Sequence, residues 1–410
     1  MRLAVELYET VIGYLEGDDG RSFDFGFDDT ARARFGSTSR VLSVSIPVVP
    51  TPPRQSAHRR RNWFSELLPE GDQLDYLLAQ SGVRRGDTLR FLARYGRDVA
   101  GALQIWDADD PTEPKIPETS TVEDHEIRRL LEDPIGAPLG NASELGRTSL
   151  GGVQPKIVLA READGWARAL GGFPSTHILK PRLAAHPTVI YDEEYGARLA
   201  RALGLADFDT RVDSFDGLAT LVVERFDRVG GRRLHQEDFN QVLGASGNQK
   251  YQEIGGVVSF ARAADALARY ASTEDLRNLA RMLVLAVAIG NLDLHTKNLG
   301  LLHPADGTVR LAPAYDQVPI AHVRGNDGRM ALAVNREYRH AALTRDDLAQ
   351  EIAGWGVRRA DATVTDALEE LRSAIEREDP IDGAHPALRS SLRTFTDNLL
   401  LGHPVGIADE

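Results

Sequence analysis

The sequence predicts an α+β protein of two lobes, with a β-rich N-terminal domain and a mostly helical C-terminal lobe. Over the first ~50 residues, apolar and polar side chains alternate between Gly, Asp and Pro, as in "LAVELY" and "SFDFGF", which is the period of half-buried strands. From about residue 235 onward, apolar residues recur at three- and four-residue spacing, as in "SFARAADALARYA", which indicates amphipathic helices. With 410 residues, the chain is too long for one ordinary core, so two or three domains are expected.

Residues 1–106 are predicted to form the β-rich N-terminal domain. A further strand is expected in "VLSVSIPVV" (41–49), and short helices are expected between residues 62 and 96. The basic run "HRRRN" (58–62) is interpreted as a solvated loop, the usual location of concentrated charge. The next segment, "DADDPTEPKIPETSTVED" (107–124), is rich in Pro, Asp and Thr and is interpreted as a linker.

Residues 107–227 and 228–410 are predicted to form a smaller and a larger lobe. In the smaller lobe, one helix (193–204) lies among four strands, in "PKIVLAR", "THILKP", "TRVDSFDG" and "ATLVVERFDR". The larger lobe is helical to its end, for example in "LRNLARMLVLAVAIG", "VTDALEELRSAIERE" and "LRTFTDNLLLG". Such a pair of lobes is an arrangement that can enclose a nucleotide.

Composition and charge restrict the function classes. The net charge of −13 argues against nucleic-acid binding over the whole surface, and the absence of cysteine excludes disulfides and Cys-ligated zinc. The longest apolar run, 282–290, is far shorter than the ~20 residues of a membrane helix, and the N-terminus has no cleavage pattern. We therefore expect a cytoplasmic protein that does not enter a membrane.

A polar cluster, "NLDLHTKN", directly follows the most apolar segment of the chain. Asp293 and Asn298 are five residues apart, the spacing of a kinase catalytic loop, in which the Asp accepts the substrate hydroxyl proton and the Asn holds magnesium. Downstream, Asp316 in "RLAPAYDQVP" could supply a second hard oxygen ligand for Mg²⁺. The alternative for Asp316 is a turn cap before Pro319.

Lysine is rare in this chain, and we expect it where a compact ammonium is needed. Lys180 in "THILKP" is interpreted as an ATP phosphate contact with a carboxylate partner on the following helix, Glu193 or, by preference, Glu194; the alternative is an exposed lysine at a strand end. The loop "RTSLGGVQPK" could cradle phosphates through its glycines. In "VVERFDR", backbone groups of residues 224–226 could bind adenine, although Phe226 could equally be a core residue.

Several motifs occur in one order: the glycine loop, "THILKP", "ERFDR", "HQEDFNQVLG", "KYQEIGG", "NLDLHTKN" and "LAPAYDQVP". Together with "LLPEGDQLDYLLAQSGV" near the N-terminus, they make the chain similar to the HipA family of bacterial serine/threonine kinase toxins. The resemblance implies a two-lobed protein-kinase-like fold, with Asp293 as catalytic base and with Asn298 and Asp316 on Mg²⁺. It implies that the ATP site contains Gly151, Gly152, Val153, Gln154, Lys156, Lys180, Glu224, Arg225, Phe226, His295, Lys297 and Tyr315.

The resemblance also implies regulation and partners. Ser149 matches the serine that family members autophosphorylate to shut off the kinase, because the added charge would repel ATP. Family members phosphorylate protein serines, aminoacyl-tRNA synthetases among them, and arrest growth. They are held by a small helix-turn-helix antitoxin that binds operator DNA. Two alternatives remain open for this chain: an antitoxin-binding co-repressor with little turnover, and a small-molecule phosphotransferase.

Overall fold

The computed structural model describes residues 1–18, 20, 22–133 and 154–406. The chain divides into two compact units, each built from segments far apart in the sequence. Unit 1 consists of residues 1–181, 213–237 and 302–309; unit 2 consists of residues 182–212, 238–301 and 310–410. Unit 1 therefore holds the predicted N-terminal domain together with most of the predicted smaller lobe. The predicted boundaries near residues 106 and 227 stay predictions.

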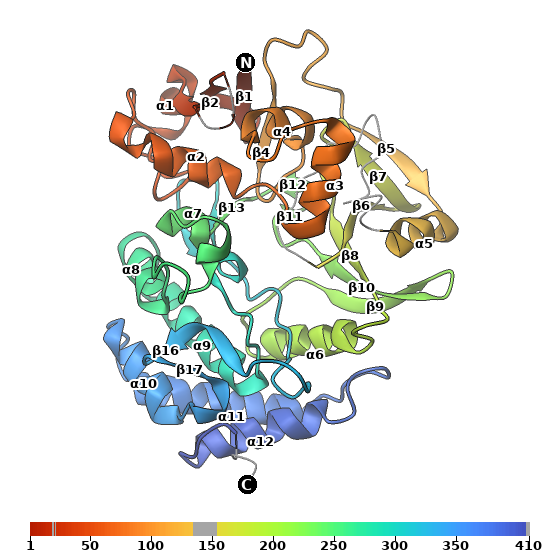
Figure 1. Cartoon of the computed structure of the whole chain (residues 1–410). Helices are drawn as coiled ribbons and strands as arrows, with labels where there is room; N and C mark the ends of the chain where they lie inside the picture. The colour runs from red at the N-terminus through yellow and green to blue at the C-terminus, as the bar shows by residue number, and fades with distance from the viewer. Residues whose placement is uncertain (19, 21, 134–153, 407–410) are drawn as a thin grey trace. The chain divides into compact units, whose positions relative to one another are not determined.

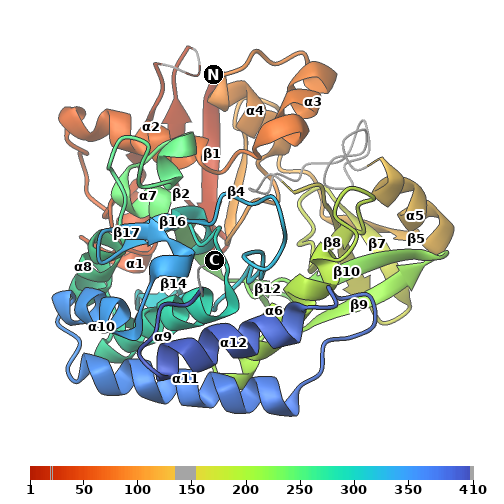
Figure 2. The same cartoon turned by 60° about the horizontal axis from the view of Figure 1, so that its bottom comes forward.

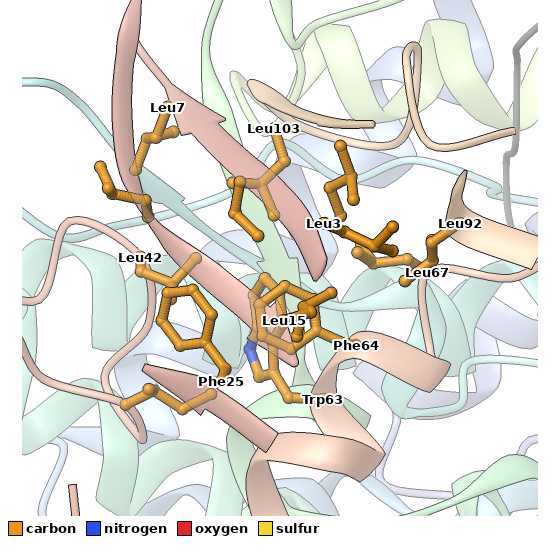
Figure 3. Close-up of a cluster of buried hydrophobic side chains, with 14 of the residues drawn as sticks. Leu3, Leu7, Leu15, Phe25, Leu42, Trp63, Phe64, Leu67, Leu92 and Leu103 are labelled. Atoms are coloured by element: carbon orange, nitrogen blue, oxygen red, sulfur yellow. The ribbon is translucent and has the colours of Figure 1, made fainter. Parts of the chain in front are cut away.

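Unit 1 begins with a four-stranded antiparallel sheet in the order β3-β2-β1-β4. The strands of this sheet are β1 (Arg2–Leu7), β2 (Thr10–Glu16), β3 (Asp24–Phe27) and β4 (Leu103–Asp107). The helices of the same region are α1 (Asp29–Phe35), α2 (Ala57–Ser65), α3 (Gly71–Ser81) and α4 (Thr88–Tyr95), with a 3-10 turn at Arg54–Ser56. Leucines of the strands pack against Trp63 and Phe64 of α2 in one buried cluster (Figure 3). The predicted strands within residues 3–27 and the predicted short helices are confirmed.

The strand expected at residues 41–49 is wrong. The segment is irregular, yet Val41, Leu42 and Val48 are fully buried or nearly so. Side chains satisfy part of its backbone in place of a strand partner, because Glu237 accepts the Val44 N–H at 2.9 Å and the Ser43 hydroxyl at 2.6 Å. The alternating pattern of residues 41–49 therefore predicted their burial correctly and their secondary structure wrongly.

The basic run 58–62 is not a solvated loop. It forms the centre of α2, and the side chain of Arg60 is 3% exposed. The guanidinium of Arg60 donates to both carboxylate oxygens of Asp24 in β3, each at 2.7 Å. One of the three arginines thus joins a helix to a strand by a bidentate ion pair, a geometry to which arginine is well suited.

The second sheet of unit 1 has six strands in the order β5-β7-β6-β8-β10-β9 (Figure 1). These strands are β5 (Glu118–Val122), β6 (Ile157–Glu162), β7 (Gly165–Leu170), β8 (His177–Pro181), β9 (Thr210–Phe215) and β10 (Leu218–Glu224). Ile127, Leu130 and Leu131 of α5 (Asp124–Glu132) share a core with Ile157 and other strand residues, so this helix covers one face of the sheet. The four strands predicted in this region are confirmed. The linker prediction for 107–124 is wrong in part, because its β-branched end forms the edge strand β5 beside β7.

Five further strands are short. These are β11 (Arg228–Val229), β12 (Arg232–Arg233), β13 (His235–Asp238), β14 (Gly300–His303) and β15 (Arg310–Leu311). The first two form a two-stranded ribbon, and the other three form a sheet in the order β13-β14-β15.

Unit 2 is mostly helical, as predicted. Its helices are α6 (Val189–Ala202), α7 (Phe239–Leu243), α8 (Phe260–Tyr270), α9 (Thr273–Ile289), α10 (Arg345–Gly354), α11 (Ala360–Arg377) and α12 (Leu388–Leu400), with a hairpin of β16 (Arg329–Val334) and β17 (Glu337–Arg339). Short 3-10 turns lie at Gly247–Lys250, Thr296–Asn298 and His340–Ala342. The long helices α11 and α12 lie side by side (Figure 2), and both contact α9, whose residues from Met282 to Ile289 are all buried. Within the described residues, no helix has the length and apolar character needed to cross a membrane.

Candidate active site

The polar cluster follows α9 because this helix has a well-defined end. Gly290 adopts a left-handed conformation, with φ of 69°, and its N–H bonds back to carbonyl oxygens of the last turn. A Cβ at this position would come within 2.6 Å of the Cβ of Ala321. Only glycine tolerates both the conformation and the close approach. The buried helix thereby delivers the next residues, 291–298, to one defined place in unit 2.

Asn291 connects the two segments that carry the predicted catalytic and metal-binding residues. Its side chain is fully buried, and its Oδ1 accepts the backbone N–H of Asp293 at 3.2 Å. Its Nδ2 donates to the backbone oxygen of Asp316 at 3.3 Å. One amide thus holds the two aspartates near one another, although they are far apart in the sequence.

The side chain of Asp293 is about half exposed, at 49%, as a group that must meet a substrate should be. The Tyr251 hydroxyl donates to its Oδ1 at 3.3 Å, and the Nε2 of His295 lies 3.8 Å from its Oδ2. The ring of His295 is almost completely buried and meets the Tyr251 ring edge-on. The predicted base and the predicted neighbour His295 are therefore in direct proximity.

The orientation of the Asn298 amide suits a role as cation ligand. Its Nδ2 donates to the backbone oxygen of Asp293 at 3.0 Å, so its Oδ1 is the amide atom that can face a cation. The second predicted ligand, Asp316, has a φ of 57°, a conformation that costs energy in a residue with a side chain. Backbone strain of this kind concentrates at functional sites.

These two oxygen donors fit Mg²⁺. Magnesium prefers hard oxygen ligands and keeps several waters, so one carboxylate and one amide oxygen suffice when phosphates supply further ligands. The segment around Asp316 is also attached to the catalytic segment by the Tyr315 hydroxyl, which donates to the backbone oxygen of Lys297 at 2.9 Å. Among the described residues, no group of three or more His, Cys, Asp or Glu side chains could hold a metal ion.

Two of the three lysines predicted for the ATP site, Lys156 and Lys180, lie in unit 1, and Lys297 lies in unit 2. Lys180 occupies β8, an inner strand of the six-stranded sheet, and only 7% of it is exposed. The alternative of a water-exposed lysine at a strand end is therefore excluded. Lys156, directly before β6, is also buried, and its backbone oxygen accepts a hydrogen bond from Gln73 at 2.9 Å.

Two further predictions concern the partner of Lys180 and the glycine loop. In unit 2, the carboxylate of Glu194, which was preferred as the partner of Lys180, forms an ion pair with Arg198 at 2.9 Å. Of the glycine loop, Gln154 is half-buried. Ser149, Gly151, Gly152 and Val153 lie outside the described residues, so their predicted roles stay predictions.

The segment predicted to meet adenine follows β10. Glu224 is exposed and Phe226 is half-buried, so Phe226 is not a simple core residue. The backbone N–H of Arg225 donates to the Thr176 oxygen at 2.9 Å, and its backbone oxygen accepts the Arg228 N–H at 3.0 Å. The backbone N–H and oxygen of Arg225 therefore have partners within unit 1, and the predicted adenine contact of residues 224–226 stays a prediction.

The side chain of Arg225 belongs to a buried charge cluster. It donates to both carboxylate oxygens of Asp227 at 2.9 Å and to the Ser175 hydroxyl at 2.8 Å. Arg228 and Arg233 bind Asp98 at 2.8 and 2.6 Å.

Although burial alone would raise the pKa of Asp98, the neighbouring guanidinium groups hold this pKa well below its usual range. The same balance between burial and Arg225 and Arg228 lowers the pKa of Asp227, whereas burial lowers the pKa of Arg228 to about 10.

The sequence reasoning missed Asn291, Tyr251 and this charge cluster. Asn291 is the first residue of the motif "NLDLHTKN", but nothing in the sequence assigned a role to it. Tyr251 follows one of the few lysines, and that rarity was the signal that could have drawn attention to it. The members of the charge cluster come from separate parts of the sequence, and no local pattern unites them.

The fold and the grouping of Asp293, Asn298 and Asp316 define a protein-kinase-like protein. Family comparisons make this specific: the HipA-like C-terminal domain matches residues 148–378, and the HipA N-terminal domain matches residues 3–106. The chain belongs to the HipA family of serine/threonine kinase toxins, and the resemblance seen in its motifs is confirmed.

Individual relatives agree with this assignment. The chain is 31% identical over 381 residues to a protein described as putative kinase Y4mE of Sinorhizobium fredii, with 90% of this chain and 89% of the relative covered. It is 30% identical over 335 residues to the serine/threonine-protein kinase toxin HipA of Shewanella oneidensis, covering 76% and 75% of the two chains. The structure is similar to that of HipA in a complex of Shewanella oneidensis HipA, HipB and operator DNA, with a TM-score of 0.77, 24% identity and coverage of 97% and 96%. The predicted kinase-like α+β fold is thereby confirmed.

Proposed function

We propose that this protein is an ATP- and Mg²⁺-dependent kinase that transfers the γ-phosphate to a protein serine and thereby arrests growth. The observation that carries the proposal is the connection of Asp293, Asn298 and Asp316 through hydrogen bonds of Asn291 and Asn298. Kinase catalysis needs a carboxylate at the acceptor hydroxyl and oxygen ligands for Mg²⁺ close to it. In this assignment, ATP is the phosphate donor, which fits the predicted cytoplasmic location.

In the proposed reaction, the carboxylate of Asp293 accepts the proton of the acceptor hydroxyl. The hydroxyl oxygen forms a bond to the γ-phosphorus while the bond from that phosphorus to the ADP oxygen breaks. Asn298 and Asp316 would hold Mg²⁺, which supplies positive charge for the phosphates when bound. The buried ammonium groups of Lys180 and Lys156 would add positive charge for the nucleotide phosphates.

The same proposal includes regulation and partners. Ser149 would receive a phosphate as an off-switch, since its charge beside the nucleotide phosphates would repel ATP. A small helix-turn-helix antitoxin would hold the kinase and connect it to operator DNA. The Shewanella oneidensis structure, which contains HipA, HipB and operator DNA, supports this part. A protein substrate such as an aminoacyl-tRNA synthetase follows from the family's known targets.

The first test is intact-mass analysis after incubation of the dephosphorylated protein with Mg²⁺ and ATP. We expect wild type to gain a phosphate that peptide mapping places on Ser149, and D293N to gain none while it still binds ATP. D293N removes the carboxylate with little change in shape, so retained ATP binding serves as the folding control. If wild type gains no phosphate, the antitoxin-binding co-repressor becomes the better description. Equal phosphorylation of wild type and D293N would remove Asp293 from the reaction.

A further inference from the structure

Tyr251 comes from a segment outside the catalytic loop, yet its hydroxyl reaches the carboxylate of Asp293. We propose that Tyr251 is a positioning residue that fixes the Asp293 carboxylate for phosphoryl transfer. This inference rests on the proposed kinase function and adds a specific residue to it. The carboxylate needs such a partner because its side chain is half exposed and would otherwise sample several rotamers.

The backbone holds Tyr251 and the catalytic segment in a fixed register. In β16, the backbone N–H of Ala331 donates to the oxygen of Leu292 at 2.9 Å, and the backbone oxygen of Ala331 accepts the N–H of Gln252 at 3.1 Å. One residue thus binds the residue before Asp293 and the residue after Tyr251. On the other side, the Thr296 hydroxyl is directed at the backbone oxygen of Lys250 at 3.2 Å and at the Asn240 side chain at 2.6 Å.

Neighbouring side chains restrict the Tyr251 ring. The His295 ring meets it edge-on at a centroid distance of 5.4 Å, and the ammonium of Lys250 lies 5.4 Å from its centre. Both neighbours are buried, and both contacts are attractive in this geometry. The hydroxyl is therefore held in place before a substrate arrives, which reduces the entropy cost of ordering the site during the reaction.

The hydrogen bond gives the two oxygens of Asp293 different tasks. The Tyr251 hydroxyl occupies Oδ1, so Oδ2 is the oxygen that takes the proton from the acceptor serine. Tyr251 keeps its own proton throughout and does not contact the reacting phosphorus. The distance of 3.3 Å is long for a hydroxyl donor, and catalytic hydrogen bonds often shorten only when substrate binds.

The test compares full-length wild type, Y251F and the control Y338F in phosphate transfer from ATP and Mg²⁺ to dephosphorylated casein. Y251F removes the hydroxyl and keeps the ring, so kcat should fall about tenfold, the effect of one hydrogen bond to a charged group. The KM for ATP should stay within about twofold because the hydroxyl acts on the Asp293 carboxylate, which serves the acceptor, and Y251F keeps the ring beside His295. Tyr338 lies on β17 with its ring under Arg329, and Y338F should retain the wild-type kcat.

Three results would count against the proposal. A kcat of Y251F equal to that of wild type removes Tyr251 from the mechanism and leaves the kinase function intact. If Y251F has both a higher KM for ATP and a lower thermal unfolding midpoint than wild type, Tyr251 has a general structural role instead. A wild type that transfers no phosphate, to casein or to itself, contradicts the kinase function and this inference together. The activity of wild type therefore separates the failure of this inference from the failure of the proposed function, and the split between kcat and KM separates a positioning role from a general structural one.

Discussion

Arg225 lies in the buried charge cluster of unit 1 and makes contacts that no single neighbour could replace. Its guanidinium donates to Asp227, to the Ser175 hydroxyl and to the backbone oxygen of Val99. Taking charges out of water is costly, and good geometry with full hydrogen bonding offsets that cost. Without Arg225, the buried carboxylate of Asp227 loses its bidentate partner and keeps only the ion pair with Arg228 at 3.1 Å.

We therefore expect R225M to lower the free energy of unfolding by about 3–5 kcal/mol, the cost of breaking a buried ion pair. Urea unfolding followed by fluorescence measures this change. R32M is the matched control, because Arg32 forms an exposed pair with Asp29 in α1, and its loss should change stability by no more than ~0.5 kcal/mol. A small loss in R225M together with much weaker ATP binding would indicate that Arg225 serves the nucleotide site and not stability.

At the level of elements, the end of α9 sets the position of the catalytic segment. Gly290 combines a left-handed backbone with a close approach to Ala321. Gly204, which follows α6 in the same unit, has nearly the same φ, 67°, but no atom within 4 Å of an added Cβ. The two glycines therefore separate the cost of backbone conformation from the cost of crowding.

G204A should lower the free energy of unfolding by about 1–2 kcal/mol, the cost of a left-handed alanine. G290A should cost more than G204A, by about 1–3 kcal/mol for the added overpacking. It should also slow phosphate transfer, since relief of the contact with Ala321 requires the segment leading to Asp293 to shift. Chemical denaturation and the casein assay measure the two effects. Equal stability losses in the two variants would show that the close approach to Ala321 costs nothing.

The local spacing of apolar residues predicted most of the helices and strands, but it did not predict hydrogen-bond partners far away in the chain. Strands β6, β8 and β10 and the helices of unit 2 follow from the spacing of their apolar residues. The segment 41–49 has the same alternation and is still irregular, because its hydrogen-bond partner Glu237 is 193 to 194 residues away in the chain. No window of local sequence contains that information.

The same distinction applies to the candidate site. The spacing of Asp293 and Asn298 is local, and the sequence predicted their pairing with Asp316 from a known motif. The contributions of Asn291 and Tyr251 depend on hydrogen bonds across 25 and 42 residues. Such contacts become visible only when the chain is folded, since polar residues of these types are ordinary in any loop.

At the scale of the whole molecule, buried histidines connect stability to pH. His235 is fully buried; its Nδ1 accepts the Ala102 N–H at 3.4 Å, so its Nε2 carries the proton donated to the Leu42 oxygen at 2.8 Å. Burial, together with the nearby His303, lowers the pKa of His235 from 6.5 to about 3. Burial likewise lowers the pKa of His340 in unit 2. The imidazole of His235 is therefore neutral in the folded protein at pH 5, where the unfolded chain would protonate it.

Below about pH 6.5, His235 binds a proton in the unfolded chain, whereas in the folded protein it stays neutral down to about pH 3. His235 therefore stabilises the fold at neutral pH, and this stabilisation is lost as the pH falls towards 3. Relative to H235Q, wild type should lose about 1.4 kcal/mol per pH unit between about pH 6 and 4.5. Urea unfolding at a series of pH values measures this difference, in which the contributions of groups that do not interact with His235 cancel. H58Q, which removes an exposed histidine of α2, should follow wild type at every pH. A difference between wild type and H235Q that does not vary with pH would mean that His235 is protonated equally in the folded and unfolded chains.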